Sequence, residues 1–253
     1  MDAQSKNCQN CKTDFTIESE DFNFYEKIKV PSPTWCPECR LVRRLLSANE
    51  RVLYKRKCDL TGRDIFSMYP ESTPFPVYET EAWYSDKWDP YQYGMEYDFS
   101  RSFFDQFLEL SKKVPKMSLV KQGFSTNSEY THRVHNLKNS YMVFRASESR
   151  DSLYIYIADD ISDCVDCFNI SKCELCYECI DSNKCYNTKF SRDSNECRDS
   201  YFLYACRNCS NCVGCVNLIN QEYFIFNQRY TKEEYFEKLK EFKLNTISGG
   251  ERM

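Results

Sequence analysis

The stretch that decides the fold is ACRNCSNCVGCVNLI, residues 205–219, in which Cys206, Cys209, Cys212 and Cys215 recur at every third position. The same phase runs from Val134 to Leu218 and comprises 29 positions. They hold eleven Cys, seven Ser, one Thr, three Ile, three Leu, two Val and two Ala. The residue before them is Asp or Asn in 14 of the 29 cases, and the residue after them is often aromatic. A three-residue motif therefore repeats across this segment.

Few backbone conformations keep a period of three. An α-helix would rotate such a stripe by about 60° per step, and a flat strand would send alternate members to opposite faces. Polyproline II bundles need abundant Gly or Pro, and this segment has one Gly and no Pro. A parallel β-solenoid (β-helix) whose coil length is a multiple of three places the same phase inward on every turn. Asp and Asn suit its corners because they tolerate left-handed conformations. The pattern therefore predicts a Cys/Ser-lined solenoid over 131–230.

The eleven cysteines of this segment have three possible roles. Ser, Ile, Ala and Leu occupy the same phase, which favours reduced thiols that fill the interior as small hydrophobic side chains. A sharper alternative is that 206–215 or 173–179 binds zinc or an iron–sulfur cluster through its CxxC pairs. Disulfide ladders are the third possibility.

The N-terminal segment contains a different cysteine pattern. CQNC at 8–11 and CPEC at 36–39 are separated by 24 residues, a spacing typical of a four-cysteine zinc ribbon. We expect Cys8, Cys11, Cys36 and Cys39 to hold one structural Zn²⁺, each pair on a tight knuckle. Structural sites of this kind are closed, so no catalysis is expected at this metal.

A basic stretch follows the second pair directly. Residues 36–63 hold eight Lys or Arg against three acidic residues, although the whole chain has a net charge of −4. As a helix, RLVRRLLSANERV (40–52) would place Leu41, Leu45, Ala48 and Val52 on one face. The candidates for contact with RNA or a ribonucleoprotein are Arg40, Arg43, Arg44, Arg51, Lys55, Arg56 and Lys57. The alternative is a solvated face paired with acidic residues of the same chain.

The remaining segments complete a mainly β chain. The aromatic-rich region 64–130 is predicted to be an α+β connector with one helix over about 101–113, ended by Pro115. TKEEYFEKLKEF (231–242) predicts an amphipathic helix that starts with a capping box and caps the solenoid, before a disordered tail NTISGGERM. The predicted domains are 1–63 (ribbon with basic helix), 64–130 (connector), 131–230 (solenoid) and 231–253 (capping helix and tail).

Three strings together resemble a known group. They are TWCPECRLVRRLLSANERVLYKRKCDLTG, FPVYETEAWYSDKWDPYQYG and NCVGCVNLINQEYFIFNQRYTKEEY. The chain resembles, over nearly its whole length, cysteine-rich zinc-ribbon proteins of uncharacterised activity from bacteria of the candidate phyla radiation (Patescibacteria). The resemblance implies intact ribbon cysteines and a Cys/Asn-rich repeat region, and it implies no activity.

The sequence favours a binding or scaffold protein over an enzyme. It shows no Gly-rich phosphate loop and no Ser/His/Asp or Cys/His pairing signature. The start MDAQSKNCQNCKTDF lacks the apolar run of a secretory signal, and no stretch of about 18 apolar residues occurs, so a cytoplasmic protein without a membrane partner is expected. The expected partners are RNA or a ribonucleoprotein at the basic helix, and a protein on the solenoid or aromatic surface. The alternatives are an assembly scaffold without nucleic-acid binding, and an enzyme with a site on the solenoid wall or in the aromatic region.

Overall fold

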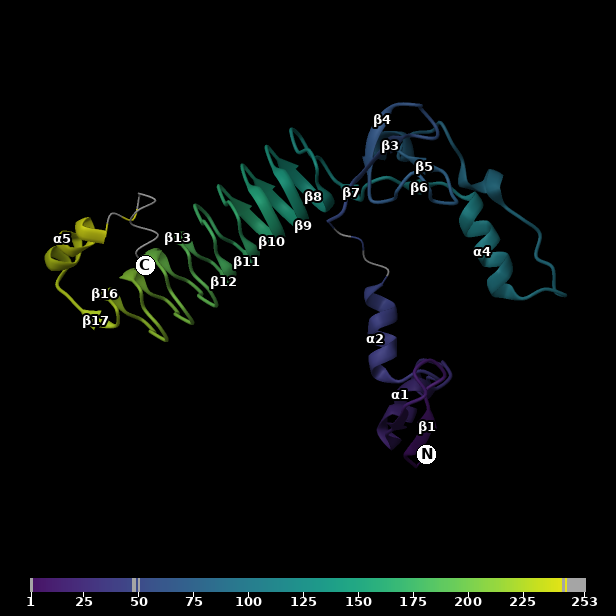
Figure 1. Ribbon diagram of the computed structural model, residues 1–253, viewed down its shortest axis with the longest axis horizontal. Coiled ribbons are helices and arrows are strands. Elements are labelled where there is room, and N and C mark those ends of the chain that lie inside the picture. Colours follow the sequence, from purple (N-terminus) through teal and green to yellow (C-terminus); the bar gives the residue numbers. More distant parts are fainter. Residues whose placement is uncertain (1, 47–48, 50, 243, 245–253) are drawn as a thin grey trace. The chain divides into compact units, whose positions relative to one another are not determined.

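The computed structural model describes residues 2–46, 49, 51–242 and 244, in two compact units, 1–49 and 50–253 (Figure 1). The predicted domain boundary at 63 falls inside a hairpin of the second unit, formed by β3 (Tyr54–Lys57) and β4 (Asp64–Ser67). The predicted basic stretch is therefore divided between the two units. Among the described residues, no helix combines the length and the apolar character needed to cross a membrane.

The first unit is small. A hairpin of β1 (Gln4–Asn7) and β2 (Asp14–Ile17) is followed by α1 (Ser19–Lys27) and α2 (Pro37–Leu45). The prediction that the basic helix continues to Val52 was wrong, because α2 ends at Leu45 and Val52 lies outside any helix; Ala48 lies outside the described residues. The helix ends at the C-cap Leu46, whose N–H binds the Val42 carbonyl at 2.9 Å, and β3 begins at Tyr54.

The connector is α+β, as predicted. After the β3–β4 hairpin come β5 (Val77–Tyr78), α3 (Thr80–Trp83), a 3₁₀ turn (Pro90–Tyr93), α4 (Phe103–Lys113) and β6 (Lys116–Met117). Helix α4 matches the predicted helix, yet its aromatic side chains at 103, 104 and 107 are exposed. Its buried residue is Gln106, whose amide binds both the N–H and the C=O of Asp98 at 2.8 and 2.9 Å. The helix therefore holds the preceding loop through a polar side chain.

The predicted solenoid is confirmed, with about nine turns over 121–225 (Figure 1). Its parallel strands pair residues twelve apart, as in Tyr141 with Leu153 and Tyr186 with Arg198, so each coil contains four triplets. The strands are β7 (Lys121–Gln122), β8 (His132–Lys138), β9 (Tyr141–Arg150), β10 (Leu153–Ser162), β11 (Phe168–Ser171), β12 (Ile180–Asn183), β13 (Tyr186–Lys189), β14 (Arg198–Tyr201), β15 (Ser210–Val213) and β16 (Glu222–Ile225). The solenoid begins about one coil before the predicted start at 131.

The corners of the coil adopt the left-handed conformation throughout. Every residue that precedes an inward position from 133 to 217 has a φ between 46° and 63°. Asp and Asn are enriched there, as the triplet predicts, but Tyr154, Phe190 and Phe202 adopt the same conformation. Stacked corner side chains also bind one another, as in Asn187 Nδ2 to Asp199 Oδ1 at 2.7 Å. The fold therefore imposes the left-handed conformation on every corner residue, and Asp or Asn at a corner lowers the free-energy cost of adopting it.

Hydrogen bonds inside the coil explain why both cysteine and serine occupy inward positions. The Cys185 thiol donates to the carbonyls of Asn183 and Ser194, at 3.6 and 3.3 Å. The Thr188 hydroxyl donates to the equivalent carbonyls, two residues before and nine after, at 3.1 and 3.2 Å. A small side chain with one donor thus satisfies the same backbone groups, whether the donor is S–H or O–H.

The C-terminal helix α5 (Lys232–Phe242) caps the last coils, as predicted. Thr231 and Glu234 form the capping box, with Glu234 N–H to Thr231 Oγ1 at 3.2 Å and Thr231 N–H to Glu234 Oε2 at 2.9 Å. Tyr235 is 1% exposed and packs with Val213 and Ile225. Val213 and Ile225 lie outside the inward phase, so Tyr235 packs on the outer face of the last coils. The edge of β16 is covered by β17 (Gln228–Arg229), which pairs with it antiparallel. The predicted disordered tail at 245–253 lies outside the described residues.

Candidate metal centre

The first cysteine pair lies in the turn of the β1–β2 hairpin. Cys8 donates its N–H to the Thr13 carbonyl and accepts the N–H of Lys12 on its own carbonyl, both at 3.0 Å. Lys12 has a φ of 64°, which closes the turn. This tight turn directs both sulfur atoms of the CQNC motif to the same side, as the sequence predicts for a metal knuckle.

The second pair opens helix α2 instead of forming a second hairpin turn. Cys36 is the N-cap, Pro37 is the first helical residue, and the Cys39 N–H lies 3.5 Å from Cys36 Sγ. The N–H of Gln9 binds the carbonyl of Thr34 at 3.0 Å and joins the knuckle to the segment before the helix. Thiolates are favoured here because the N-terminus of a helix carries partial positive charge.

The four sulfur atoms of Cys8, Cys11, Cys36 and Cys39 converge, all within 4.8 Å of one another. Cys11 Sγ and Cys36 Sγ are 3.7 Å apart, which matches the roughly 3.8 Å edge of a tetrahedron with metal–sulfur bonds of about 2.3 Å. N–H groups point at the sulfurs, from the Cys36 backbone to Cys8 at 3.2 Å and from the Asn10 amide to Cys39 at 3.3 Å. The donor set and its hydrogen bonds fit a tetrahedral metal site.

The protonation of the thiols depends on this crowding. Burial opposes ionisation of Cys8, but the N–H groups of Cys36, Cys11 and Asn10 outweigh it and lower its pKa to about 6. For Cys36 the N–H of Cys39 favours the thiolate, yet burial and the three neighbouring thiols raise its pKa to about 11. Four thiolates therefore need a cation between them.

The solenoid cysteines form no comparable group. Over residues 2–46, 49, 51–242 and 244, no other three Cys, His, Asp or Glu side chains bring ligand atoms within metal-binding distance of one another. All eleven are free and buried, and no disulfide is formed. Burial raises the pKa of Cys206 to about 11, while the polar contact with the Cys212 side chain lowers the pKa of Cys215 to about 7. This arrangement matches core thiols and gives no support to a metal cluster inside the coil.

The predicted basic residues fall into two groups. Arg40, Arg43 and Arg44 lie on α2, with Arg40 half-buried and the other two exposed. The Arg43 guanidinium lies 5.1 Å from the centre of the Trp35 ring, a cation–π contact. These three residues follow directly from the turn that carries Cys36 and Cys39.

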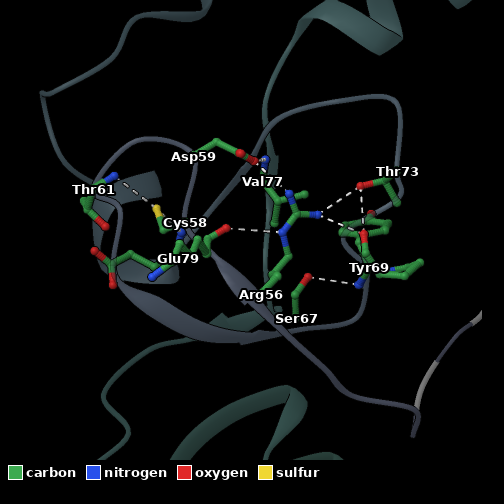
Figure 2. A network of polar contacts seen from close by, with 11 residues as sticks. Arg56, Cys58, Asp59, Thr61, Ser67, Tyr69, Thr73, Val77 and Glu79 are labelled. Atoms are coloured by element: carbon green, nitrogen blue, oxygen red, sulfur yellow. Dashed lines mark hydrogen bonds and ion pairs between the residues drawn. The ribbon is translucent and has the colours of Figure 1, made fainter.

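The other predicted basic residues lie in the second unit and contact its own side chains. The Arg51 guanidinium lies 5.3 Å from the Tyr156 ring centre, and Lys55 Nζ lies 5.8 Å from that of Phe66. Lys57 pairs with Asp64 at 3.1 Å. Arg56 is 8% exposed and binds Asp59, Thr73 and the Pro70 carbonyl (Figure 2). Arg56 is therefore a structural residue and is not available to a partner.

Sequence reasoning missed Asn10, the donor to Cys39; its position between two ligands of a CxxC motif was the available signal. The chain matches no protein-family model and no curated protein sequence.

Proposed function

We propose that the four cysteines hold one structural Zn²⁺, and that the protein binds RNA or a ribonucleoprotein through α2 without acting as an enzyme. The observation that carries this proposal is the placement of three arginines on a helix whose first turn supplies two metal ligands. No residue of α2 itself is buried, so the helix presents its side chains outward. The solenoid serves as a scaffold on which a protein partner docks.

Zinc is the metal that best suits this ligand set. Four thiolates from two short motifs satisfy tetrahedral Zn²⁺ completely, and no position remains open for a substrate. The metal would therefore stabilise the fold and position α2, and it would take no part in a reaction.

Charge reversal on α2 tests the RNA contact. We expect Arg43→Glu with Arg44→Glu to weaken binding of a single-stranded RNA oligonucleotide by about tenfold or more. The slope of log affinity against log salt should fall by about 1.4, since each lost phosphate contact removes about 0.7 for a single strand. Fluorescence anisotropy at several salt concentrations measures both quantities.

The matched control reverses two exposed lysines of the same unit, with Lys27→Glu and Lys29→Glu. It changes the net charge by the same amount and leaves α2 intact. An equal loss of RNA affinity in both variants would mean that binding depends on the net charge of the unit and not on α2. Unchanged affinity in the arginine variant would exclude the proposed contact. Elemental analysis should find the same metal content in all three proteins.

Protein docking through α2 is the second candidate, because its apolar side chains are exposed. Leu41, Val42 and Leu45 are 47%, 54% and 63% exposed, and Leu46 beyond the helix is 81% exposed. The first partner to test is a second copy of the chain. We expect self-association in sedimentation that Leu41→Asp with Leu45→Asp removes without loss of metal; a monomeric parent protein would exclude this partner.

A further inference from the structure

The hairpin β3–β4 of the second unit repeats the metal-binding hairpin of the first. Strands β3 and β4 pair from Tyr54 with Ser67 to Lys57 with Asp64, in the same register as β1 and β2 from Gln4 with Ile17 to Asn7 with Asp14. The turn between β3 and β4 begins at Cys58, the counterpart of Cys8. A left-handed Gly62, with a φ of 73°, stands where the first turn has left-handed Lys12.

The backbone contacts around the two turns correspond one by one. The Cys58 N–H binds the Arg63 carbonyl at 2.8 Å, and the Gly62 N–H binds the Cys58 carbonyl at 2.9 Å, as Cys8, Thr13 and Lys12 do in the first turn. The N–H of Asp59 binds the carbonyl of Val77 at 3.0 Å, which repeats the contact of Gln9 with Thr34.

The correspondence extends to the helix that completes the site. Glu79 is the N-cap of α3, as Cys36 is the N-cap of α2. The Glu79 N–H lies 3.3 Å from Cys58 Sγ (Figure 2), which repeats the 3.2 Å contact of the Cys36 N–H with Cys8 Sγ. One turn into each helix, an N–H binds the N-cap carbonyl, from Trp83 at 2.9 Å and from Arg40 at 3.1 Å. The backbone of the metal module is thus present twice.

Three of the four ligands are missing from the second copy. Cys58 occupies the position of Cys8, while Thr61, Glu79 and Ala82 occupy those of Cys11, Cys36 and Cys39. A metal that joins a hairpin to a helix is therefore replaced by another link. Asp59 supplies it: its Oδ2 accepts the N–H of Val77, in the strand that leads to α3, at 2.6 Å, and the Arg56 guanidinium binds the same oxygen at 2.9 Å (Figure 2).

The second copy also covers the first coil of the solenoid. The Ser118 N–H binds the Tyr78 carbonyl at 2.8 Å, and the Thr80 hydroxyl donates to the Leu119 carbonyl at 2.9 Å. The Phe66 and Tyr130 rings lie edge to face with centres 4.6 Å apart. A solenoid needs such a cover at both ends, and β17 together with α5 supplies it at the other.

We infer that residues 54–83 are a second, metal-free copy of the four-cysteine module, which retains a dormant metal site and serves as the N-terminal cap of the solenoid. The polar network of Arg56 and Asp59 replaces the metal as the link between hairpin and helix. The inference concerns the second unit alone and stands apart from the proposed RNA binding.

Restoring the three ligands tests the dormant site. The variant Thr61→Cys, Glu79→Cys and Ala82→Cys is made in a Cys36→Ser, Cys39→Ser background, so that the first site cannot hold metal. We expect one added Co²⁺ per chain, with the absorption of a tetrahedral thiolate complex, and its loss on a further Cys58→Ser. The background protein without the three new cysteines should show no such absorption. A folded variant that shows none either would overturn the inference.

A second measurement keeps the inference testable if the full set of substitutions folds poorly. Arg56→Met should lower the thermal midpoint of the otherwise unchanged chain, because it removes the cation that holds the Asp59 carboxylate against the Val77 N–H. In the chain that carries only the three new cysteines, saturated with Zn²⁺, we expect the same substitution to lower the midpoint by less than half as much. An equal drop of the thermal midpoint in both proteins would contradict the inference that the polar network takes the place of the metal.

Discussion

Replacing Cys36 and Cys39 by serine should remove the metal and unfold the first unit, while the solenoid stays folded. The buried apolar residues described in the first unit are Ile17 and Phe22, together with Cys8 and Cys36, which are themselves proposed ligands. Units of this size rarely fold without a metal or disulfides, and structural zinc contributes roughly 10–16 kcal/mol of apparent binding free energy. Two aromatic or aliphatic side chains cannot replace that contribution.

Hydrogen exchange and elemental analysis measure the two expected effects. Amides of β1, β2 and α2 should lose protection, and those of β9 to β15 should keep it. The matched control is Cys58→Ser, which changes a buried cysteine that is no proposed ligand and should leave the metal content at one per chain. Metal retained in the double variant, or full protection of the first hairpin without metal, would contradict the assignment.

Asn187→Pro should disrupt the solenoid, whereas Asn187→Gly should cost little. Asn187 occupies a corner with a φ of 46°, and its N–H binds the Glu174 carbonyl of the previous coil at 2.9 Å. Proline fixes φ near −65° and has no N–H, so it conflicts with the corner twice. We expect a loss of about 3 kcal/mol or more in the free energy of unfolding, which denaturant titration would measure.

Glycine at the same position separates the two causes. It adopts positive φ without strain and keeps the N–H, so only the bond from Asn187 Nδ2 to Asp199 is lost. The expected cost is about 1 kcal/mol or less. Equal destabilisation by both substitutions would show that the side-chain ladder matters more than the backbone conformation of the corner.

The solenoid could be predicted because its triplet expresses backbone geometry directly. One residue of each triplet must fit a narrow interior, and the residue before it must adopt the left-handed backbone conformation. The amino-acid composition therefore repeats with the same period of three. The coil length of twelve could not be derived, since every multiple of three places the same residues inward. The start of the solenoid was missed because Lys121 and Gln122 belong to a coil without the Cys or Asp signature.

The errors in the basic stretch concern contacts that periodicity and charge do not encode. Periodicity in 40–52 favours a helix beyond Leu45, but α2 ends there, and residues from Tyr54 onward pair with β4 in the second unit. Charge alone could not separate Arg56, which is buried against Asp59, from Arg43, which is exposed. The likeness between the two hairpins could not be predicted from the sequence, because they share backbone hydrogen bonds while only Cys58 matches one of the four cysteines.

The equivalence of S–H and O–H donors inside the coil has a consequence for how this chain can change in length. Each coil makes the same backbone bonds to its neighbours whatever small residue lies inward, so whole coils are interchangeable units. Adding or deleting twelve residues would leave every corner and every stacked column aligned and move the α5 end by one strand spacing of about 4.8 Å. Inserting or deleting only three residues would keep the same residues inward, but every following triplet would move to the next side of the coil and lose its place in its column. Gain or loss of whole coils would therefore change the length of the solenoid in fixed steps.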